Sequence, residues 1–461
     1  TQFMDSELMN YLTTTLNKMA NGGIYDQVGG GFSRYSVDEK WHVPHFEKML
    51  YDNAQLVSVY AQAYKLTKNE RYKIIVSETL SFINEQMISP EGAFYSSLDA
   101  DSQNTDNELE EGVYYTWTKE ELKQHLNEDY ELFKDYYNVN ENGFWEKEQY
   151  ILYKTKSDEE FTKIHAVTLQ SLQTKVKHWK NLLSAKRNTR KAPRLDDKIL
   201  TSWNALMIKA YLEAYTALEN KEYLEIALKN ARFIRDKQLQ PDGQLMHSYK
   251  SGSSTIDGFS EDYAQVISAY IDLYQSTLDR SWLNLAKDLM DYSIKHFLNK
   301  KNSMFYFTSD EVTNLIARKI ELFDNVLPAS NSVQAINLYE LGHYYYNESY
   351  SKLAKQMLSN VNDDIEASPA AFTNWLKLYL NYAKPFYEVA ISGSEAGHKL
   401  KELNSAYVPN IIVAGAIKDD NLPLLINKFT ETTTLIYVCV NGTCKMPVKQ
   451  INEALKMIKN E

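Results

Sequence analysis

The residues best suited to chemistry gather first in residues 22–53, which read GGIYDQVGGGFSRYSVDEKWHVPHFEKMLYDN. This stretch separates two segments with helical periodicity, and a connector of roughly twenty residues in a compact domain is usually functional or disordered. Disordered segments lack aromatic residues, whereas this one is rich in them, so we expect an ordered loop that carries a site. Its candidate side chains are Arg34, Tyr35, His42, His45 and Glu47.

The two histidines and Glu47 resemble a metal-binding cluster in composition. Their H-x-x-H spacing, however, places them at a helix entrance rather than on one helical face, which does not fit the spacing of zinc sites. We therefore predict a polar pocket wall, with neither a metal nor another cofactor.

Four later loops also enter helices and carry acidic, basic and aromatic side chains. They are residues 96–117, 192–204, 255–263 and 327–332. Glycosidic cleavage needs two carboxyl groups, one protonated as general acid and one ionised. Epimerisation instead needs two opposed proton-transfer groups, often histidines. For any single acidic residue, such as Glu261, capping of a helix N-terminus is an equally good interpretation.

The elements that must position these loops are helices, because apolar and aromatic residues recur at three and four positions up to about residue 384. An internal repeat underlies the pattern: units aligned at Asn53, Asn204, Tyr263 and Ser332 all have a tyrosine seven residues later. The repeat predicts helical hairpins. We expect helices at 5–21, 46–66, 70–88, 118–138 (broken), 158–183, 198–219, 221–238, 260–278, 281–299, 329–346, 349–360 and 367–382.

Repeated helical hairpins either stack into an open solenoid or close into a ring. Counting favours closure, because the expected helices divide into six inner and six outer ones when the broken pair at 118–183 is included. We therefore predict a mainly α protein: an (α/α)6 toroid over residues 1–384, followed by a small α/β appendage over residues 385–461. Every long loop enters an inner helix, so we expect the candidate residues on one rim, around one cavity.

Acid/base roles are best assigned to carboxylates from different loops, because a pair from one loop could not straddle a substrate. We predict Asp99 or Asp101 together with Asp197 or Glu261. In the isomerase alternative, His42 or His45 is the base, and carboxylates fix its tautomer. The residues assigned to substrate binding are Arg34, Tyr35, Glu47, Glu111, Tyr114, Asp196, Lys198, Trp203, Asn204, Asp262, Tyr263 and Asn331.

The expected appendage contains the segments EVAIS, NIIVAG and LIYVCV, which have the composition of buried strands, and two helices at 395–403 and 452–459. Asn441-Gly442 predicts a two-residue hairpin turn. This turn places Cys439 opposite Cys444, within reach of a disulfide. We consider them a candidate redox pair, with two unlinked thiols or half of a metal site as alternatives.

Composition limits the function classes. A net charge of −11 with mixed signs argues against general nucleic-acid binding. There is no run of 18 apolar residues, so we expect no membrane span. Two cysteines in 461 residues exclude a disulfide scaffold and favour a reducing compartment, hence a cytoplasmic protein.

Four segments resemble the spermatogenesis-associated protein 20 family: GGIYDQVGGGFSRYSVDEKWHVPHFEKMLYDNAQL, SLDADS…EEGVYYTWT, DDKILTSWNALMIKA and YVCVNGTCKMPV. The resemblance extends over essentially the whole chain. Members of this family have an N-terminal thioredoxin-like domain followed by a region similar to N-acylglucosamine 2-epimerase and six-hairpin glycosidases. The resemblance implies an (α/α)6 toroid and a role in carbohydrate metabolism, and it implies that the thioredoxin-like domain is absent from this chain.

Two hypotheses follow for the function. The first is a sugar-active enzyme, either a hydrolase that uses paired carboxylates or an isomerase or epimerase that uses a histidine. The second is a non-catalytic module that binds carbohydrates or client proteins and works with the missing thioredoxin-like domain. Both hypotheses predict an acidic, aromatic pocket for a small sugar ligand.

Overall fold

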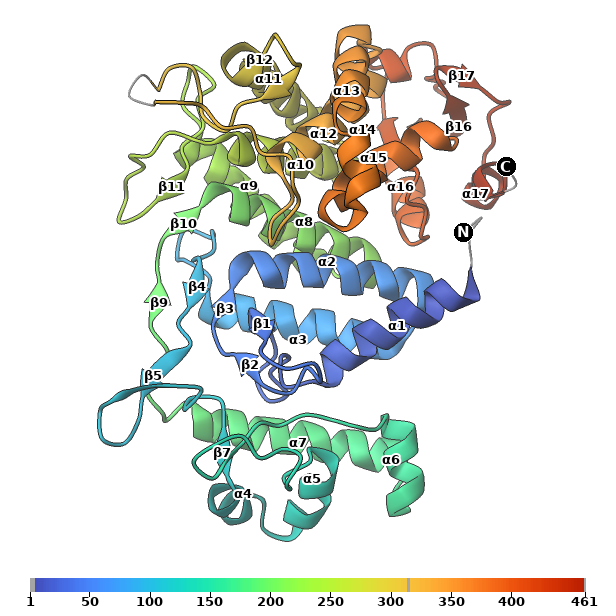
Figure 1. Ribbon diagram of the computed structural model, residues 1–461. Helices are drawn as coiled ribbons and strands as arrows, with labels where there is room; N and C mark the ends of the chain where they lie inside the picture. Colours follow the sequence, from blue (N-terminus) through green and yellow to red (C-terminus); the bar gives the residue numbers. More distant parts are fainter. Residues whose placement is uncertain (1–4, 313–315, 460–461) are drawn as a thin grey trace.

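The computed structural model describes residues 5–312 and 316–459, and its dominant feature is a ring of helical hairpins (Figure 1). Within the described residues, five inner helices surround a central cavity. They are α2 (Leu50–Thr67), α8 (Thr201–Leu218), α10 (Ser260–Thr277), α12 (Ser330–Tyr345) and α15 (Thr373–Ala383). Each of them packs against the next along the chain.

Amphipathic helices alternate with the inner ones along the chain and lie outside them. They are α1 (Ser6–Asn21), α3 (Glu70–Gln86), α9 (Lys221–Phe233), α11 (Arg280–Phe297) and α13 (Glu348–Asn360). Short connections join α2, α8, α10 and α12 to the outer helix that follows each of them, whereas long loops return from an outer to an inner helix. This arrangement is the predicted toroid of helical hairpins, with five inner and five outer helices among the described residues rather than the six of each counted from the sequence.

The sequence repeat has a packing explanation. Tyr60 on α2 lies 5.6 Å, between ring centroids, from Tyr72 on α3. The equivalent contact between α8 and α9 joins Tyr211 to Tyr223 at 5.9 Å, and Tyr270 of α10 is similarly placed against the next outer helix. In these three hairpins, therefore, an inner-helix tyrosine packs on an outer-helix aromatic ring, a favoured arrangement of buried rings. Tyr339 of α12 instead packs on Tyr382 of α15.

One expected hairpin is not part of the ring, which corrects our assignment of residues 118–183. These residues form four helices with their own apolar core around Trp117, Phe133 and Trp179, and they lie beyond α3 in Figure 1. Helix α2 instead packs directly on α8. Periodicity shows that a helix has an apolar face, but not which partner covers that face. The four helices are α4 (Lys119–Leu126), α5 (Tyr130–Tyr136), α6 (Asp158–His165) and α7 (Leu169–Arg187).

Short strands of two or three residues pair with one another and so connect the long loops by backbone hydrogen bonds. Sheet β3-β4-β9 joins the first three of these loops, and the other pairs lie within or between neighbouring loops. The strands are β1 (Tyr35–Ser36), β2 (Pro44–His45), β3 (Lys48–Met49), β4 (Ser97–Leu98), β5 (Asp101–Gln103), β6 (Leu109–Glu111), β7 (Trp117–Thr118), β8 (Gln149–Tyr150), β9 (Leu195–Asp196), β10 (Ile199–Leu200), β11 (Ser248–Tyr249), β12 (Leu298–Asn299) and β13 (Met304–Phe305).

The C-terminal residues form a four-stranded mixed sheet of order β15-β14-β16-β17. The elements are β14 (Tyr387–Ser392), α16 (Ala396–Asn404), β15 (Ile411–Ala416), β16 (Leu435–Val440), β17 (Thr443–Cys444) and α17 (Ile451–Lys459). A short helix, α14 (Asn362–Ala367), precedes this region and lies between α13 and α15 in the chain. Cys439 opposes Cys444 in register, and the two form a disulfide. The small α/β appendage is therefore confirmed.

The division of the chain into domains at residue 384 stays a prediction. Ala390, Ile412 and Ala414 of the sheet belong to the same apolar core as the helical ring. Residues 1–4 and 460–461, at the outer ends of the two predicted domains, lie outside the described residues. In the part of the chain that the structure describes, no helix combines the length and the apolarity needed to cross a bilayer.

Candidate functional site

The first long loop folds into a small hairpin that presents His45. Strand β1 pairs with β2, so that Tyr35 and His45 are register partners, and their rings stack with centroids 4.9 Å apart. The turn between the strands is organised by Asp38, whose carboxylate accepts hydrogen bonds from the backbone N–H groups of Lys40, His42 and Val43. Local hydrogen bonding of this kind is typical of aspartate in turns.

His45 is oriented by a carboxylate from another loop. Its Nδ1 lies 2.8 Å from Oε1 of Glu111, which is held on β6 and also accepts the backbone N–H of Phe46. An Nδ1–H that donates to Glu111 leaves Nε2 with its lone pair, the form that a base requires. Nε2 lies 3.7 Å from Oε2 of Glu47.

Arg34, Glu47 and Asp52 complete a group that we call the His45 cluster, together with His45 and Glu111. Arg34 forms an ion pair of 3.1 Å with Glu47. Burial raises the pKa of Asp52 to about 7, an effect that the charge of Arg34 opposes and that of Glu47 reinforces. One Asp52 carboxyl oxygen is buried without a hydrogen-bond partner among the described residues, which is rare for a structural carboxylate.

Replacing Asp52 by asparagine should stabilise the protein at pH 8 but not at pH 4. The folded-state pKa is raised to about 7, so the native protein retains a proton that the unfolded chain loses near pH 4, and wild-type stability falls as pH rises between these values. The variant avoids this loss, which for a shift of about three pKa units amounts to about 4 kcal/mol. Urea unfolding of both proteins across this pH range measures the difference; equal pH profiles would show that Asp52 titrates normally.

A second group, the His247 cluster, contains Lys198, His247, Glu261 and Asp262. Nδ1 of His247 lies 2.9 Å from Oδ2 of the fully buried Asp262. Burial lowers the pKa of His247, but the hydrogen bond and charge of Asp262 outweigh this effect and raise it overall. Burial and the neighbouring Asp262 also raise the pKa of Glu261 to about 7.

The first turn of α8 joins the two clusters. The backbone N–H of Ser202 donates to Asp262 at 3.0 Å, and the ring of the next residue, Trp203, lies edge-on to Tyr51 with centroids 4.7 Å apart. Tyr51 immediately precedes Asp52 on α2. The turn that carries Trp203 thus contacts Asp262 of one cluster and Tyr51, the neighbour of Asp52 in the other, and the role of Trp203 as an aromatic wall stays a prediction.

The other predicted acidic residues lie on the same loops as exposed ion pairs. Asp99 pairs with Arg194 at 2.5 Å, Asp196 with Lys198 at 3.0 Å, and Asp197 with Lys250 at 2.5 Å. Asp101 stands opposite Glu111 in the β5–β6 register. An exposed, paired carboxylate is a weak candidate for a general acid, so the predicted pairing of Asp99 with Asp197 finds no support here.

Four predicted substrate-binding residues, whose assignment stays a prediction, are buried and make contacts within the protein. The side-chain amide of Asn204 forms hydrogen bonds with the backbone N–H and the carbonyl of Phe94. Asn331 binds the N–H and the carbonyl of Phe305 in the same way. The hydroxyl oxygen of Tyr263 accepts a hydrogen bond from the backbone N–H of Leu245. These contacts fix long-loop turns on the inner helices. The fourth residue is Tyr114, which is 4% exposed.

His42 is separated from His45 in its contacts. Its ring lies 4.7 Å from that of Tyr153, and burial lowers its pKa despite the charge of Asp38. No contact of His42 with the His45 cluster is found among the described residues. The choice between the two histidines, left open by the sequence, therefore favours His45.

Sequence reasoning missed His247 and Asp52 as site residues. Asp52 lies in the first turn of α2, where an acidic residue usually stabilises the helix N-terminus, so its position alone does not indicate a site. His247 precedes a strand in a turn-rich segment without a recognisable motif. His247, Glu261 and Asp262 offer ligand atoms within 4.8 Å of one another. However, both Asp262 oxygens already accept hydrogen bonds from His247 or the backbone, so we interpret the group as a proton-transfer cluster.

Comparison with known proteins places the chain among its relatives. No family model matches it. It is 31% identical over 487 residues to an uncharacterised protein of Caenorhabditis elegans, and 29% identical over 485 residues to human spermatogenesis-associated protein 20. These alignments cover 97% and 96% of the chain. The chain belongs to the spermatogenesis-associated protein 20 family. It spans 66% and 62% of the length of these two relatives.

The fold of this spermatogenesis-associated protein 20 relative is shared with an enzyme of known structure. A sugar epimerase from a ruminal bacterium superposes with a TM-score of 0.51, covering 78% of this chain and 72% of the epimerase. The sequences are 13% identical, so this likeness concerns the fold. It confirms the predicted fold class, a mainly α toroid.

Proposed function

We propose that this protein is a carbohydrate-processing enzyme that transfers protons to and from a sugar at the long-loop rim, as an epimerase or isomerase does. One observation carries the proposal. His45 and His247 come from different loops, and each is held through Nδ1 by a carboxylate, at 2.8 Å from Glu111 and 2.9 Å from Asp262. In each ring, Nε2 is thus the nitrogen that can accept or donate the reacting proton.

Two such histidines match the requirement for inverting a carbon next to a carbonyl. One removes the proton from one face as a general base, and the other supplies a proton as a general acid. His247, whose pKa is raised by Asp262, suits the acid role, and His45 suits the base. Lys198 and Arg34 provide positive charge for the oxyanion that develops on the sugar. Trp203 forms the wall on which the sugar ring stacks.

A glycoside hydrolase is the second candidate, and a specific observation favours it. Burial raises the pKa of both Asp52 and Glu261 to about 7, as expected of a carboxylic acid that protonates a leaving group. In this reaction the paired carboxyl groups, rather than the histidines, would face the substrate.

Incubation with a panel of aldoses and disaccharides, including mannose, cellobiose and mannobiose, distinguishes the candidates by their products. We expect a new epimer or ketose of unchanged length, separated by anion-exchange chromatography. Release of monosaccharide from the disaccharides alone would favour the hydrolase. Binding of a sugar without any product would favour the non-catalytic module.

A further inference from the structure

The inner helices enclose a cavity of about 650 Å³ whose lining is distinct from the rim clusters. Its walls come from the later turns of α2, α8, α10, α12 and α15, and residues 403–411 of the appendage cover it. None of the candidate residues on the long loops lines it. Small-molecule sites have volumes of roughly 300–1,000 Å³, so this cavity has the size of a binding site.

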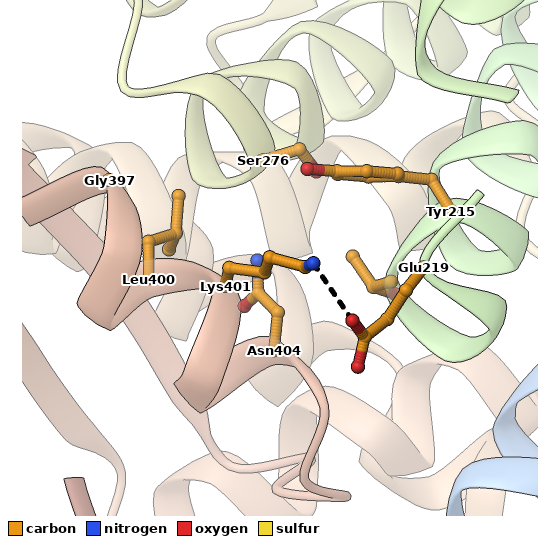
Figure 2. Close-up of a pocket in the computed structure, with 8 residues that line it drawn as sticks. Tyr215, Glu219, Ser276, Gly397, Leu400, Lys401 and Asn404 are labelled. Atoms are coloured by element: carbon orange, nitrogen blue, oxygen red, sulfur yellow. Dashed lines mark ion pairs between the residues drawn. The ribbon is translucent and has the colours of Figure 1, made fainter. Parts of the chain in front are cut away.

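The cover of the cavity is fixed to the ring. Figure 2 shows helix α16 facing the ends of α8 and α10, with Lys401 paired to Glu219 at 2.9 Å. The backbone of Val413 is held from both sides, because its N–H donates to Gln275 at 3.0 Å and its carbonyl accepts the hydroxyl of Tyr344 at 2.9 Å. The cavity is therefore a built feature rather than a gap between loosely packed parts.

Part of the charge inside the cavity is already neutralised. Lys209 of α8 forms an ion pair of 2.7 Å with Asp272 of α10 and donates to Ser268 at 2.6 Å. Glu213, one turn after Lys209, accepts a hydrogen bond from Gln62 of α2 at 3.2 Å. These contacts organise one side of the lumen.

Three further titratable side chains of the lining have no ion-pair partner among the described residues. Lys65 on α2 and Glu340 on α12 line the cavity, and among the described residues neither has a hydrogen-bond or ion-pair partner. Lys377 on α15 contacts Asn374 at 3.2 Å but no carboxylate. Burial raises the pKa of Glu340 to about 8, so its carboxyl group is protonated at neutral pH and acts as a donor. The charge of Glu213 acts on Lys65, and the charges of Asp324 and Glu213 act on Lys377, but among the described residues neither lysine has a carboxylate within ion-pair distance. Enclosed cations without a direct ion pair are unfavourable and suit an anionic ligand.

We propose that this cavity is a second binding site, which takes a small polyhydroxylated anion such as a sugar acid or a sugar phosphate. Lys65 and Lys377 bind the charged group from two sides of the lumen. Glu340 donates to an oxygen of the ligand, and Asn381 lies on the same wall for its hydroxyl groups. This assignment does not depend on the chemistry at the long-loop rim.

Isothermal titration calorimetry of the whole chain with gluconate and glucose 6-phosphate tests the proposal, with glucose as the uncharged control. We expect at least one charged probe to bind and glucose to bind far more weakly. Lys65→Met should weaken binding roughly ten- to hundredfold, the effect of losing one hydrogen bond to a charged group. Lys73→Met, on the exposed side of outer helix α3, is the matched control and should leave affinity unchanged.

Lys377→Met provides a second test from another helix, in case Lys65→Met alters folding. The proposal is overturned if neither charged probe binds, or if both variants fold and retain wild-type affinity. It is also overturned if Arg34→Met, at the long-loop rim, abolishes binding while the cavity variants do not. Because these readouts measure binding and not turnover, they are separate from the test of catalysis.

Discussion

Replacing His247 by glutamine should lower the turnover number of sugar epimerisation by roughly 10²- to 10⁴-fold, the usual contribution of a general acid or base. Its Nδ1 is held by the buried Asp262 at 2.9 Å, so the ring is fixed by the fold and glutamine cannot take over the proton. Substrate affinity should change little, because the loss concerns proton transfer. Steady-state kinetics that separate kcat from KM measure this effect.

His296→Gln is the matched control for that substitution. His296 also bonds a carboxylate through Nδ1, at 2.9 Å from Asp310, but it lies on outer helix α11 and contacts neither cluster. Its replacement should leave kcat within a factor of about two of the wild-type value, a far smaller change than the one expected for His247→Gln. If His247→Gln kept more than a tenth of wild-type kcat, His247 would not be a catalytic acid or base.

Asp26→Asn should destabilise the protein by roughly 3–5 kcal/mol, the cost of removing one partner from a buried ion pair. Asp26 accepts from Lys48 at 2.9 Å and from Arg187 at 2.8 Å, and the three side chains are at most 8% exposed. Asparagine keeps the shape but leaves two buried cations without a counter-charge. A lower urea midpoint measures the loss.

The pH dependence gives that prediction a second check. Although burial opposes ionisation, the charges of Arg187 and Lys48 hold the pKa of Asp26 well below its usual range. A lowered pKa contributes stability that is complete above the unfolded value near 4 and declines at lower pH. The gap between wild type and variant should thus persist at pH 7 and shrink below pH 4. Glu348→Gln, which removes an exposed pair with Lys352, should not shift the midpoint.

This ion triad also explains why the first loop needs its glycines. A side chain at Gly29 would collide with the guanidinium of Arg187, and Gly30, with φ of +74°, passes within contact distance of the Glu78 backbone. The loop that carries His45 is therefore anchored on α7 and α3 through a region that tolerates no Cβ. This anchoring links the outlying helices α4–α7 to the rim.

Local signals in the sequence were sufficient for most of the fold. Helix positions follow from apolar periodicity, and Asn441-Gly442 fixes the hairpin that joins Cys439 to Cys444. The place of α4–α7 could not be predicted, because it depends on long-range contacts such as that of Lys180 with Glu78. Amphipathic helices of a ring and of a side cluster have the same pattern.

The site was predictable only in part, for a related reason. Residue type and loop position selected His45, Glu47 and Glu111 as candidates, but they did not distinguish the buried Asn204 from these candidates. Lys209 and Glu213, spaced four apart, resemble an exposed helical ion pair, yet they face the central cavity. Burial of a charge is a property of the assembled ring, and no local pattern reveals it.

Incorporation of deuterium from solvent tests the central claim most directly. The protein is incubated in D₂O with an aldose that it converts, and the carbon next to the carbonyl is followed by proton NMR. Transfer through His45 and His247 predicts that the product carries deuterium at this carbon, and that His45→Gln and His247→Gln abolish its formation. A product without solvent deuterium, or deuterium uptake that both variants retain, would contradict proton transfer by these histidines.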